Sequence, residues 1–274
     1  MKEKLQKVKQ ILANMESVLI AFSGGVDSAF LLKVARDVLG NRVLAVTAKS
    51  LIHPLEEIKQ AKGIALDLGV KHKIIETQEL SNPRFFNNSK DRCYWCKREL
   101  YGELIGIAGD NNLNYVLDGT NFDDLNDFRP GIKAARELGT RSPLIEAKFT
   151  KEDIRTLSKG MGLEVWGKPS LACLASRFPY GMKITREDVA KIDNAERFLR
   201  GLGITQARVR HHDGIVRIEV MDEDISKLLG EKLRGQILSH FKGLGYLYVT
   251  IDLEGYRTGS MNEVLQRDEI TSSP

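Results

Sequence analysis

The chain has 274 residues, a formal net charge of +4, and 42% hydrophobic and 28% charged residues. This length suits one large domain or two ordinary ones, and the composition is that of a globular protein. No apolar run reaches the roughly 18 residues of a membrane span, and the charged N-terminal segment excludes a secretory signal, so we expect a cytoplasmic protein with no membrane partner. The mild basic excess suits a small anionic substrate, and we expect no nucleic-acid partner.

The first part of the sequence alternates between strand and helix patterns. We expect strands at Val18–Phe22, Val43–Thr47, Lys73–Thr77 and Tyr115–Leu117, and helices at Ala29–Leu39, Pro54–Leu68, Cys96–Ala108 and Lys151–Met161. Thr150 and Asp153 have the spacing of a capping box before the last helix. This alternation predicts an α/β domain with a parallel sheet that helices cover on both faces.

A loop-like stretch from Gly167 to Gly181 marks the expected end of this domain, which gives domains at residues 1–180 and 181–274. The second domain has the pattern α-β-β-α-β of a smaller α+β unit, which would serve the substrate or oligomerisation. Its expected elements are a helix from Thr185 to about Leu202, strands at Ala207–His211 and Ile215–Val220 around the hairpin signal Asp213-Gly214, a helix at Asp224–Phe241 and a strand at Tyr246–Leu253.

The first strand is followed by Ser23-Gly24-Gly25-Val26-Asp27-Ser28 and then by a helix. Backbone N–H groups at a helix N-terminus attract anions, and glycines let the backbone approach phosphate oxygens closely. Ser23 and Ser28 add hydroxyl donors, and Asp27 suits Mg²⁺, although it also suits the N-cap of the helix. The segment lacks the Gly-Lys-Ser/Thr ending of a Walker A loop, so no lysine reaches the phosphates from it.

Three segments follow predicted parallel strands, namely Ser23–Ser28, Ala48–His53 and Asp118–Asp124. Ligands of parallel α/β sheets bind outside the carboxyl ends of the strands. We therefore expect these three segments to lie at one edge of the sheet and to form the site.

The chain has three cysteines, a Cys93-x-x-Cys96 pair and Cys173. In a cytosolic protein they favour metal binding or catalysis over disulfides. The pair alone is compatible with a redox centre, with half a zinc site completed by His53 or His72, or with no function. Three thiolates can also hold three irons of a [4Fe–4S] cluster and leave the fourth iron open for a sulfide. A persulfide or a sacrificed sulfur on Cys173 is a further alternative.

Ser23–Ser28 resembles the PP-loop of the ATP pyrophosphatases, which hold the pyrophosphate of ATP. With the runs Asp118–Asn121, Gly167–Gly181 and Arg208–His212, the whole chain resembles the LarE family of ATP-dependent sulfur transferases. The resemblance implies a Rossmann-like PP-loop domain, use of ATP with Mg²⁺, and a role in making the nickel-pincer nucleotide cofactor. The reaction implied is adenylylation of a carboxylate of a pyridinium dicarboxylate mononucleotide, and then replacement of oxygen by sulfur.

Some members of that family sacrifice a cysteine in the segment that corresponds to Cys173, which makes Cys173 the candidate catalytic sulfur. Other members carry three cysteines and use an iron–sulfur cluster, and Cys93, Cys96 and Cys173 match this second type. The resemblance therefore implies a [4Fe–4S] cluster, and we further expect a separate sulfur donor and a homo-oligomer.

The residues also suggest how substrate is held. Arg208 and Arg210 alternate on a predicted strand and share one face, where together with Arg177 they can clamp phosphate or carboxylate groups. Glu196 and Glu219 are candidates to orient these arginines. A solvated strand face is the alternative interpretation. Trp95 can stack on the pyridinium or adenine ring, or can simply shield the two cysteines beside it.

Three other functions compete with sulfur transfer to a carboxylate. A tRNA-thiolating PP-loop enzyme shares the loop and often the three cysteines, but the sequence has no basic run or zinc ribbon for RNA. An amide-forming synthetase would leave the cysteines without a task. A nucleotide-binding module without catalysis is the third alternative.

Overall fold

The computed structural model describes residues 1–126, 130–168, 172–257 and 259–264. The chain forms two compact units, the first made of residues 1–85 and 90–171 and the second of residues 86–89 and 172–274. The change of unit after residue 171 falls in the predicted boundary stretch, ahead of the boundary that we place after residue 180. Among the described residues, no helix is both long and apolar enough to cross a membrane.

The first unit is built on a parallel four-stranded sheet, as the alternation predicts. The sheet has the order β3-β2-β1-β4, and all its pairs are parallel. The strands are β1 (Val18–Ala21), β2 (Val43–Lys49), β3 (Lys71–Glu76) and β4 (Tyr115–Leu117). Successive parallel strands need crossover connections, which contain α2 (Val26–Leu39), α3 (Leu55–Asp67) and α5 (Arg92–Asp110). Helix α5 lies on the connection between the two edge strands, β3 and β4.

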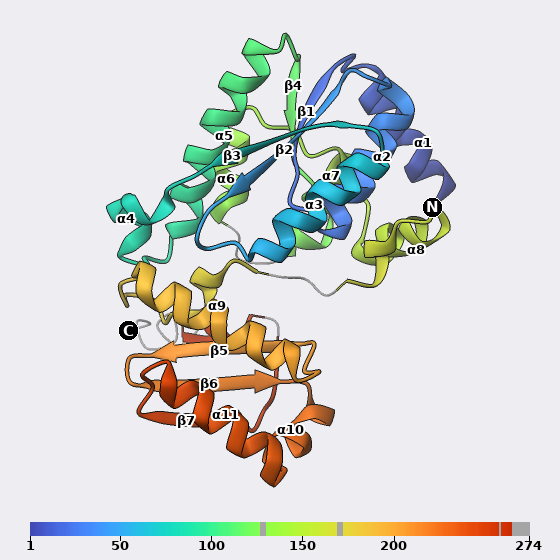
Figure 1. Ribbon diagram of the computed structural model, residues 1–274. Coiled ribbons are helices and arrows are strands. Elements are labelled where there is room, and N and C mark those ends of the chain that lie inside the picture. The colour runs from blue at the N-terminus through green and yellow to red at the C-terminus, as the bar shows by residue number, and fades with distance from the viewer. Residues whose placement is uncertain (127–129, 169–171, 258, 265–274) are drawn as a thin grey trace, which may run out of the picture. The chain divides into compact units, whose positions relative to one another are not determined.

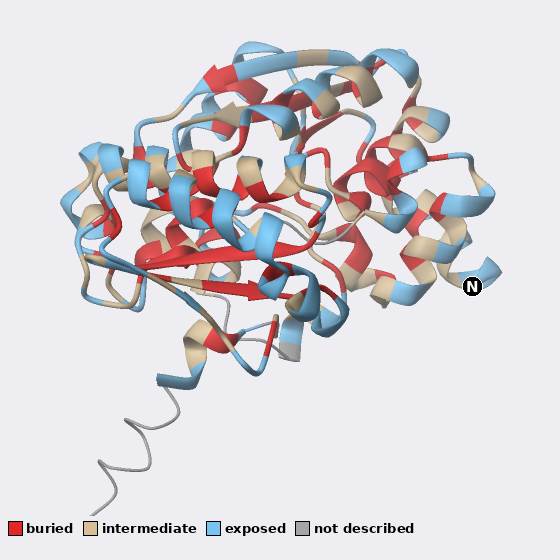
Figure 2. Cartoon of the chain, turned by 60° about the horizontal axis from the view of Figure 1, so that its bottom comes forward, coloured by how far each residue is buried: buried red, intermediate tan, exposed pale blue. Residues whose placement is uncertain are grey.

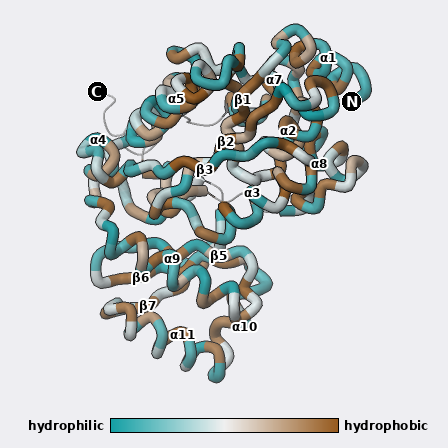
Figure 3. Tube along the Cα trace, turned by 45° about the horizontal axis from the view of Figure 1, so that its top comes forward, coloured by the Kyte–Doolittle hydropathy of each residue, from teal (hydrophilic) through white to brown (hydrophobic). Residues whose placement is uncertain are grey.

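Helices cover both faces of this sheet (Figure 1). Successive side chains of a strand point to opposite faces, so the apolar run of β1, brown in Figure 3, serves two cores. Val18 and Ile20 pack with α1 (Lys2–Ala13) and α2, whereas Leu19 packs with Leu104 and its neighbours on α5. The prediction of a Rossmann-like domain is therefore confirmed.

Some details of the first unit differ from the prediction. Helix α5 begins at Arg92 rather than at the predicted Cys96, so Cys93 lies within the helix and not before it. The sequence pattern does not predict the short helices α4 (Pro83–Phe86), α6 (Pro130–Glu137) and α7 (Pro143–Glu146). Helix α8 (Lys151–Gly160) begins at the predicted capping box of Thr150 and Asp153.

The second unit follows the predicted α-β-β-α-β order with one change. Its elements are α9 (Arg186–Gly201), β5 (Ala207–His212), β6 (Ile215–Val220), α10 (Asp222–Leu229), α11 (Glu231–Gly243) and β7 (Tyr248–Ile251). Strands β5 and β6 form the predicted hairpin, and β7 pairs parallel to β6. The single helix expected at Asp224–Phe241 is divided in two, because Gly230 takes an extended backbone with ψ of 135°.

The central strands of the second unit lie in its interior. Strand β5 is buried from Ala207 to His211, and Figure 2 shows β5 and most of β6 as buried. Helix α9 packs on β5. Arg208 and Arg210 are 3% and 5% exposed, so the alternative of a solvated strand face does not hold.

Candidate functional site

The loop after β1 is shaped to place backbone N–H groups around an anion. Helix α2 begins at Val26, three residues before the predicted start at Ala29, and its N-cap Gly25 has no side chain to cap it. The first N–H groups of a helix have no intrahelical acceptor, which makes them available to phosphate oxygens. Gly24 has φ of +73°, and a Cβ there would lie 3.0 Å from the Cβ of Ala61. Backbone conformation and packing on α3 therefore both require glycine at position 24.

Hydroxyl groups fix the shape of the same loop. The Oγ atoms of Ser23 and Ser28 lie 3.1 Å apart, and the Ser28 hydroxyl donates to the Gly25 carbonyl at 3.1 Å. The Gly25 N–H donates to the Ser23 Oγ at 3.3 Å. The five predicted nucleotide-binding residues, Ser23, Gly24, Gly25, Asp27 and Ser28, are thus brought together, as expected from a contiguous motif.

Asp27 lies in the first turn of α2 and is not its N-cap, so the capping alternative is wrong. Its Oδ2 accepts a hydrogen bond from the Lys151 ammonium, while its Oδ1 is buried with no hydrogen-bond partner among the described residues. A buried carboxylate oxygen that lacks a partner fits a cation ligand, and Mg²⁺ prefers oxygen ligands. The residue present therefore fits the Mg²⁺ that accompanies ATP.

The segment after β4 packs against the same loop, as predicted. A Cβ on Gly119 would lie 2.9 Å from the Ser28 backbone nitrogen, so position 119 requires glycine as well. Asp118 is buried and accepts hydrogen bonds from the Tyr101 hydroxyl at 3.3 Å and the Thr120 N–H at 3.1 Å. Burial and the Asp118 charge raise the pKa of Tyr101 well above its usual value, so this hydroxyl stays a donor.

The end of β2 contacts the residue before the loop. The Thr47 hydroxyl donates to the Phe22 carbonyl at 2.6 Å and lies 2.8 Å from Nε2 of His72. Burial lowers the pKa of His72, and the Lys62 charge lowers it further, so this imidazole is neutral at pH 7. These contacts fix the backbone just before the loop, and His72 has a structural role as the partner of Thr47.

Lys151 is a functional candidate that the sequence interpretation did not identify. It stands 124 positions after Asp27, at the first position of α8. The Asp123 Oδ2 accepts a hydrogen bond from the Lys151 N–H at 2.8 Å, which joins the segment after β4 to the start of α8. The signal in the sequence was the capping box at Thr150, which predicts where the helix begins but not which loop it faces.

The three cysteines are half-buried thiols in different parts of the fold. Cys93 and Cys96 lie in the first turns of α5 in the first unit, and Cys173 belongs to the second unit, just before a 3-10 helix at Leu174–Arg177. Two residues three apart on a helix share a side, and a helix N-terminus favours thiolates. Within the described part of the chain no group of three or more His, Cys, Asp and Glu side chains is placed to hold a metal ion. This applies to zinc with His53 or His72 and to a cluster on the three cysteines alike, so both stay predictions.

Trp95 is held by neighbours from its own unit. Its indole N–H donates to Asp91 at 2.8 Å, and the Arg84 guanidinium lies 3.8 Å from the ring centroid. Tyr94 contacts it edge-on at 5.0 Å. A ring-stacking role for Trp95 stays a prediction, and it must accommodate the arginine on one face.

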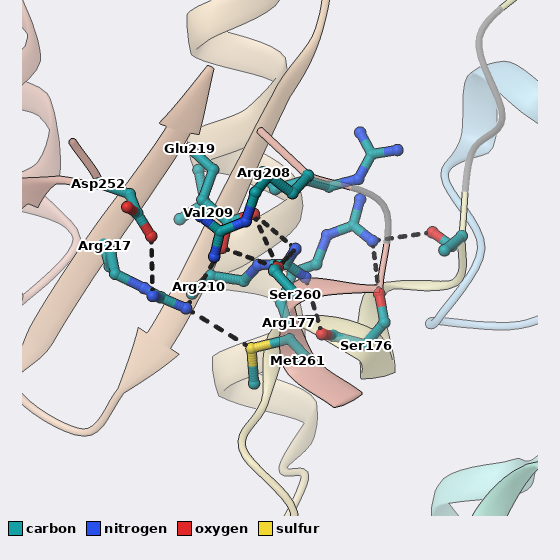
Figure 4. Close-up of polar contacts among 12 residues, drawn as sticks. Ser176, Arg177, Arg208, Val209, Arg210, Arg217, Glu219, Asp252, Ser260 and Met261 are labelled. Atoms are coloured by element: carbon teal, nitrogen blue, oxygen red, sulfur yellow. Dashed lines mark hydrogen bonds and ion pairs between the residues drawn. The ribbon is translucent and has the colours of Figure 1, made fainter. Parts of the chain in front are cut away.

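The second unit contains a buried network of arginines and carboxylates (Figure 4). Arg177, 1% exposed, forms a bidentate pair with Glu196, with distances of 2.7 and 2.9 Å from Nε and Nη2. Its Nη1 donates to the Ser176 hydroxyl at 2.7 Å and to the Cys173 carbonyl at 3.3 Å. Burial acts to lower the pKa of Arg177, but the Glu196 carboxylate outweighs it and the pKa is raised.

Arg210 occupies the other half of this network. It donates to Glu219 at 2.6 Å, to the Ser260 hydroxyl at 3.0 Å and to the Ser176 carbonyl at 3.0 Å. Its Nε is buried with no hydrogen-bond partner among the described residues. The expected orienting roles of Glu196 and Glu219 therefore match pairs that exist, with Arg177 and with Arg210.

Arg208 lies in the same network, where its surroundings disfavour its positive charge. Burial lowers the pKa of Arg208, and the like charge of Arg177 lowers it further. Its guanidinium lies 5.0 Å from the ring centroid of Tyr256. Arg217 completes the group through Asp252 at 2.8 Å and Glu219 at 3.2 Å. These residues place four guanidinium groups beside three carboxylates, and guanidinium groups suit an anionic ligand.

A family model described as NAD synthase matches residues 2–92, the part that contains the loop and the strands β1, β2 and β3 of its sheet. With the relative described next, this match places the chain among the ATP-utilising enzymes of the PP-loop class. The chain is 40% identical to the pyridinium-3,5-bisthiocarboxylic acid mononucleotide synthase of Lactiplantibacillus plantarum, over 95% of this chain and 94% of that protein. It therefore belongs to the LarE family of sulfur transferases.

Two further relatives also match over nearly their whole length. An uncharacterized protein of Synechocystis is 43% identical over 97% of this chain and 100% of its own length. An uncharacterized protein of Methanocaldococcus jannaschii is 32% identical over 93% of this chain and 98% of its own. Both units are therefore covered by the likeness, which extends well beyond the loop.

Proposed function

We propose that the protein converts a carboxylate of pyridinium-3,5-dicarboxylate mononucleotide into a thiocarboxylate, with cleavage of ATP to AMP and pyrophosphate. The observation that carries the proposal is the 40% identity to the Lactiplantibacillus plantarum synthase over 95% of the chain. The loop at Ser23–Ser28, with the buried Oδ1 of Asp27 that has no partner among the described residues, supports the use of ATP with Mg²⁺.

Activation is needed because a carboxylate oxygen is a poor leaving group. A carboxylate oxygen attacks the α-phosphorus of ATP, the bond to the β-phosphate breaks, and pyrophosphate leaves. A sulfide nucleophile then attacks the carbonyl carbon, and AMP leaves with the original carboxylate oxygen. In this scheme the N–H groups at the start of α2 bind phosphate oxygens, and Asp27 holds the metal that balances their charge.

The second unit supplies a fitting site for the anionic substrate. Arg177, Arg208 and Arg210 are buried, and two of them are already fixed by carboxylates, which reduces the entropy lost on binding. Guanidinium groups bind phosphate and carboxylate by paired hydrogen bonds. We propose that these arginines hold the phosphate or the carboxylates of the mononucleotide.

The sulfur chemistry is assigned to the three cysteines. Thiolates are the usual ligands of iron–sulfur clusters, so Cys93, Cys96 and Cys173 fit a [4Fe–4S] cluster by donor type. Such a cluster would supply an iron with an open position that can bind sulfide. A separate sulfur donor would then restore the sulfide, and turnover would be catalytic. We also propose a homo-oligomer, which sedimentation would test.

The role of Asp27 is tested by its replacement. We expect Asp27→Ala to abolish formation of AMP and pyrophosphate, because the metal and the leaving group lose their anchor. Asp37→Ala is the matched control, since Asp37 lies on the same helix and forms an exposed pair with Lys33 at 2.6 Å. Wild-type rates of AMP formation in Asp27→Ala would show that the loop is assigned wrongly.

The cysteine assignment has its own test in protein purified without oxygen. Each single Cys→Ala change at positions 93, 96 and 173 is expected to abolish iron binding and sulfur transfer, while AMP formation survives. A sacrificial Cys173 gives the opposite pattern. It allows one turnover per chain, leaves dehydroalanine at 173 by mass spectrometry, and makes the reaction indifferent to Cys93→Ala.

A further inference from the structure

Arg177 contacts the segment that carries Cys173 at several points (Figure 4). Its Nη1 donates to the Ala172 carbonyl at 3.0 Å, to the Cys173 carbonyl at 3.3 Å and to the Ser176 hydroxyl at 2.7 Å. These three acceptors span residues 172–176, from the start of the segment into the 3-10 helix that follows it. One guanidinium nitrogen therefore holds the chain on both sides of the cysteine.

The Cys173 carbonyl is held by more donors than an ordinary loop carbonyl. Besides Arg177, it accepts hydrogen bonds from the Ser176 N–H at 3.0 Å and from the Ser176 hydroxyl at 2.9 Å. A carbonyl oxygen has two lone pairs, so three donors restrict it strongly. The Cys173 backbone has φ of −55° and ψ of 150°. The direction of its Cα–Cβ bond is thereby set, and only side-chain rotation is left to place the sulfur.

The rest of the Arg177 guanidinium is anchored on two other elements of the second unit. Its Nε and Nη2 form the bidentate pair with Glu196 on α9, at 2.7 and 2.9 Å. The same carboxylate accepts the N–H of Val209 on β5 at 3.1 Å. The side chains of Arg177 and Glu196 are only 1% and 2% exposed. The pair therefore connects the cysteine segment to α9 and β5 through the interior of the unit.

We propose that Arg177 is a positioning residue for Cys173, in which the Glu196 pair holds the guanidinium and the guanidinium holds the sulfur-bearing segment. All three guanidinium nitrogens already donate to protein acceptors, so this role is separate from any contact with substrate. It rests on the use of Cys173 in the proposed function, and it applies equally to a cluster ligand and to a sacrificed sulfur. In both cases the sulfur must meet the activated carboxylate in a defined place, because small misplacements slow a reaction steeply.

A misplaced sulfur has a distinct consequence in the proposed scheme. Adenylylation takes place between ATP and the carboxylate and does not involve Cys173. When the sulfur nucleophile is displaced, water attacks the carbonyl carbon of the acyl-adenylate instead, AMP leaves, and the original carboxylate is restored. Loss of positioning therefore lets AMP and pyrophosphate form while the yield of thiocarboxylate falls. Loss of a substrate contact would lower both products together.

The test compares three variants of the full chain, purified without oxygen. Arg177→Lys keeps the charge but loses the fork that binds Glu196 and the segment at once. Ser176→Ala removes one hydroxyl contact and leaves the pair between Arg177 and Glu196. Arg200→Lys is the matched control, because Arg200 pairs with the same Glu196 carboxylate, at 3.9 Å, from a partly exposed position on α9.

Two measurements are made on each variant. Hydrogen-exchange mass spectrometry follows the opening of residues 172–178, and product analysis gives the ratio of thiocarboxylate to AMP. We expect Arg177→Lys to speed exchange there about 10- to 100-fold, as for loss of one hydrogen bond to a charged group. We expect the same variant to lower the product ratio about 10- to 100-fold while AMP formation continues. Ser176→Ala is expected to change both in the same direction by less, and Arg200→Lys to match the wild type.

Unchanged exchange or an unchanged product ratio in Arg177→Lys would overturn the positioning role. An equal fall of AMP and thiocarboxylate would also overturn it, because it would make Arg177 a substrate ligand only. A wild type that forms no AMP from ATP and the dicarboxylate would overturn the proposed function, and the exchange rates would still decide whether Arg177 fixes the segment. If Arg177→Lys folds poorly, Ser176→Ala decides, and a product ratio equal to that of the wild type overturns the role.

Discussion

The two units contain two anion-directed regions that are built in opposite ways. The loop of the first unit is made from backbone, with Gly24 and Gly25 leading into α2 and a single carboxylate, Asp27, close by. The network of the second unit is made from side chains, with Arg177, Arg210 and their carboxylate partners buried together. The first region binds anions through backbone N–H groups, which carry no full charge. The second region buries full charges, and their burial costs free energy unless each charge is paired.

This difference affects how selective each region is expected to be for its ligand. A backbone loop binds any triphosphate that its shape admits, because each N–H group is alike. A guanidinium network has a fixed arrangement of forks, and its fit depends on where the carboxylates hold them. Because Glu196 and Glu219 already hold two arginines, we expect the proposed binding of substrate in the second unit to depend on the stability of the network.

The largest expected effect is a loss of stability when a charge pair of the second unit's network is removed. Glu196→Ala leaves the buried Arg177 guanidinium without its carboxylate, and loss of one partner of a buried pair costs about 3–5 kcal/mol. Urea denaturation measures the change in the free energy of unfolding. The control is Glu254→Ala, whose pair with Arg257 is exposed, so its removal is expected to change the free energy of unfolding far less. Similar losses in both variants would show that the network is not a buried, coupled unit.

The next effect concerns substrate affinity. Arg208→Ala or Arg210→Ala is expected to weaken binding of the mononucleotide more than binding of ATP, by about 2–5 kcal/mol. The reason is that both arginines belong to the unit that does not contain the Ser23–Ser28 loop. Calorimetry with each ligand separates the two affinities. Arg197→Ala, which removes an exposed arginine of α9, serves as control, and unchanged substrate affinity in both variants would exclude them from the site.

A smaller effect is expected from a change in the backbone loop of the first unit. Gly24→Ala is expected to weaken ATP binding and to destabilise the first unit by about 1–3 kcal/mol, because the new Cβ meets Ala61 at a positive φ. Gly162→Ala is the matched control, with φ of +75° against +73° and open space around its Cβ. The difference between the two variants isolates the packing on α3. If Gly162→Ala loses as much stability and ATP binding persists in Gly24→Ala, the close approach has no functional role.

The sequence allowed prediction of those parts that depend on neighbours along the chain. The strand β1, the Ser23–Ser28 loop and α2 are contiguous, so one sequence pattern contains all the backbone N–H groups of the proposed phosphate site. The capping box at Thr150 and the hairpin at Asp213-Gly214 are local for the same reason, and both are confirmed.

Tertiary partners account for what the sequence did not reveal. Asp27 and Lys151 are 124 positions apart, and Arg177 meets Glu196 only because α9 returns to the 3-10 helix at Leu174–Arg177. The sequence predicts the start of α5 too late because Cys93 and Trp95 are modest helix formers. In the structure α5 packs against α6, and tertiary packing supplies most of a helix's stability. The spacing of the cysteines indicates ligand type, and their convergence stays a prediction.

The central claim is that ATP activates a carboxylate oxygen that sulfur then replaces, and one isotope measurement tests it most directly. The mononucleotide is labelled with oxygen-18 in both carboxylates and incubated with the protein, Mg-ATP and a sulfur source, and the nucleotide products are examined by mass spectrometry. We expect each thiocarboxylate formed to be matched by one AMP that carries a single oxygen-18. Unlabelled AMP, or ADP with labelled phosphate, would contradict it.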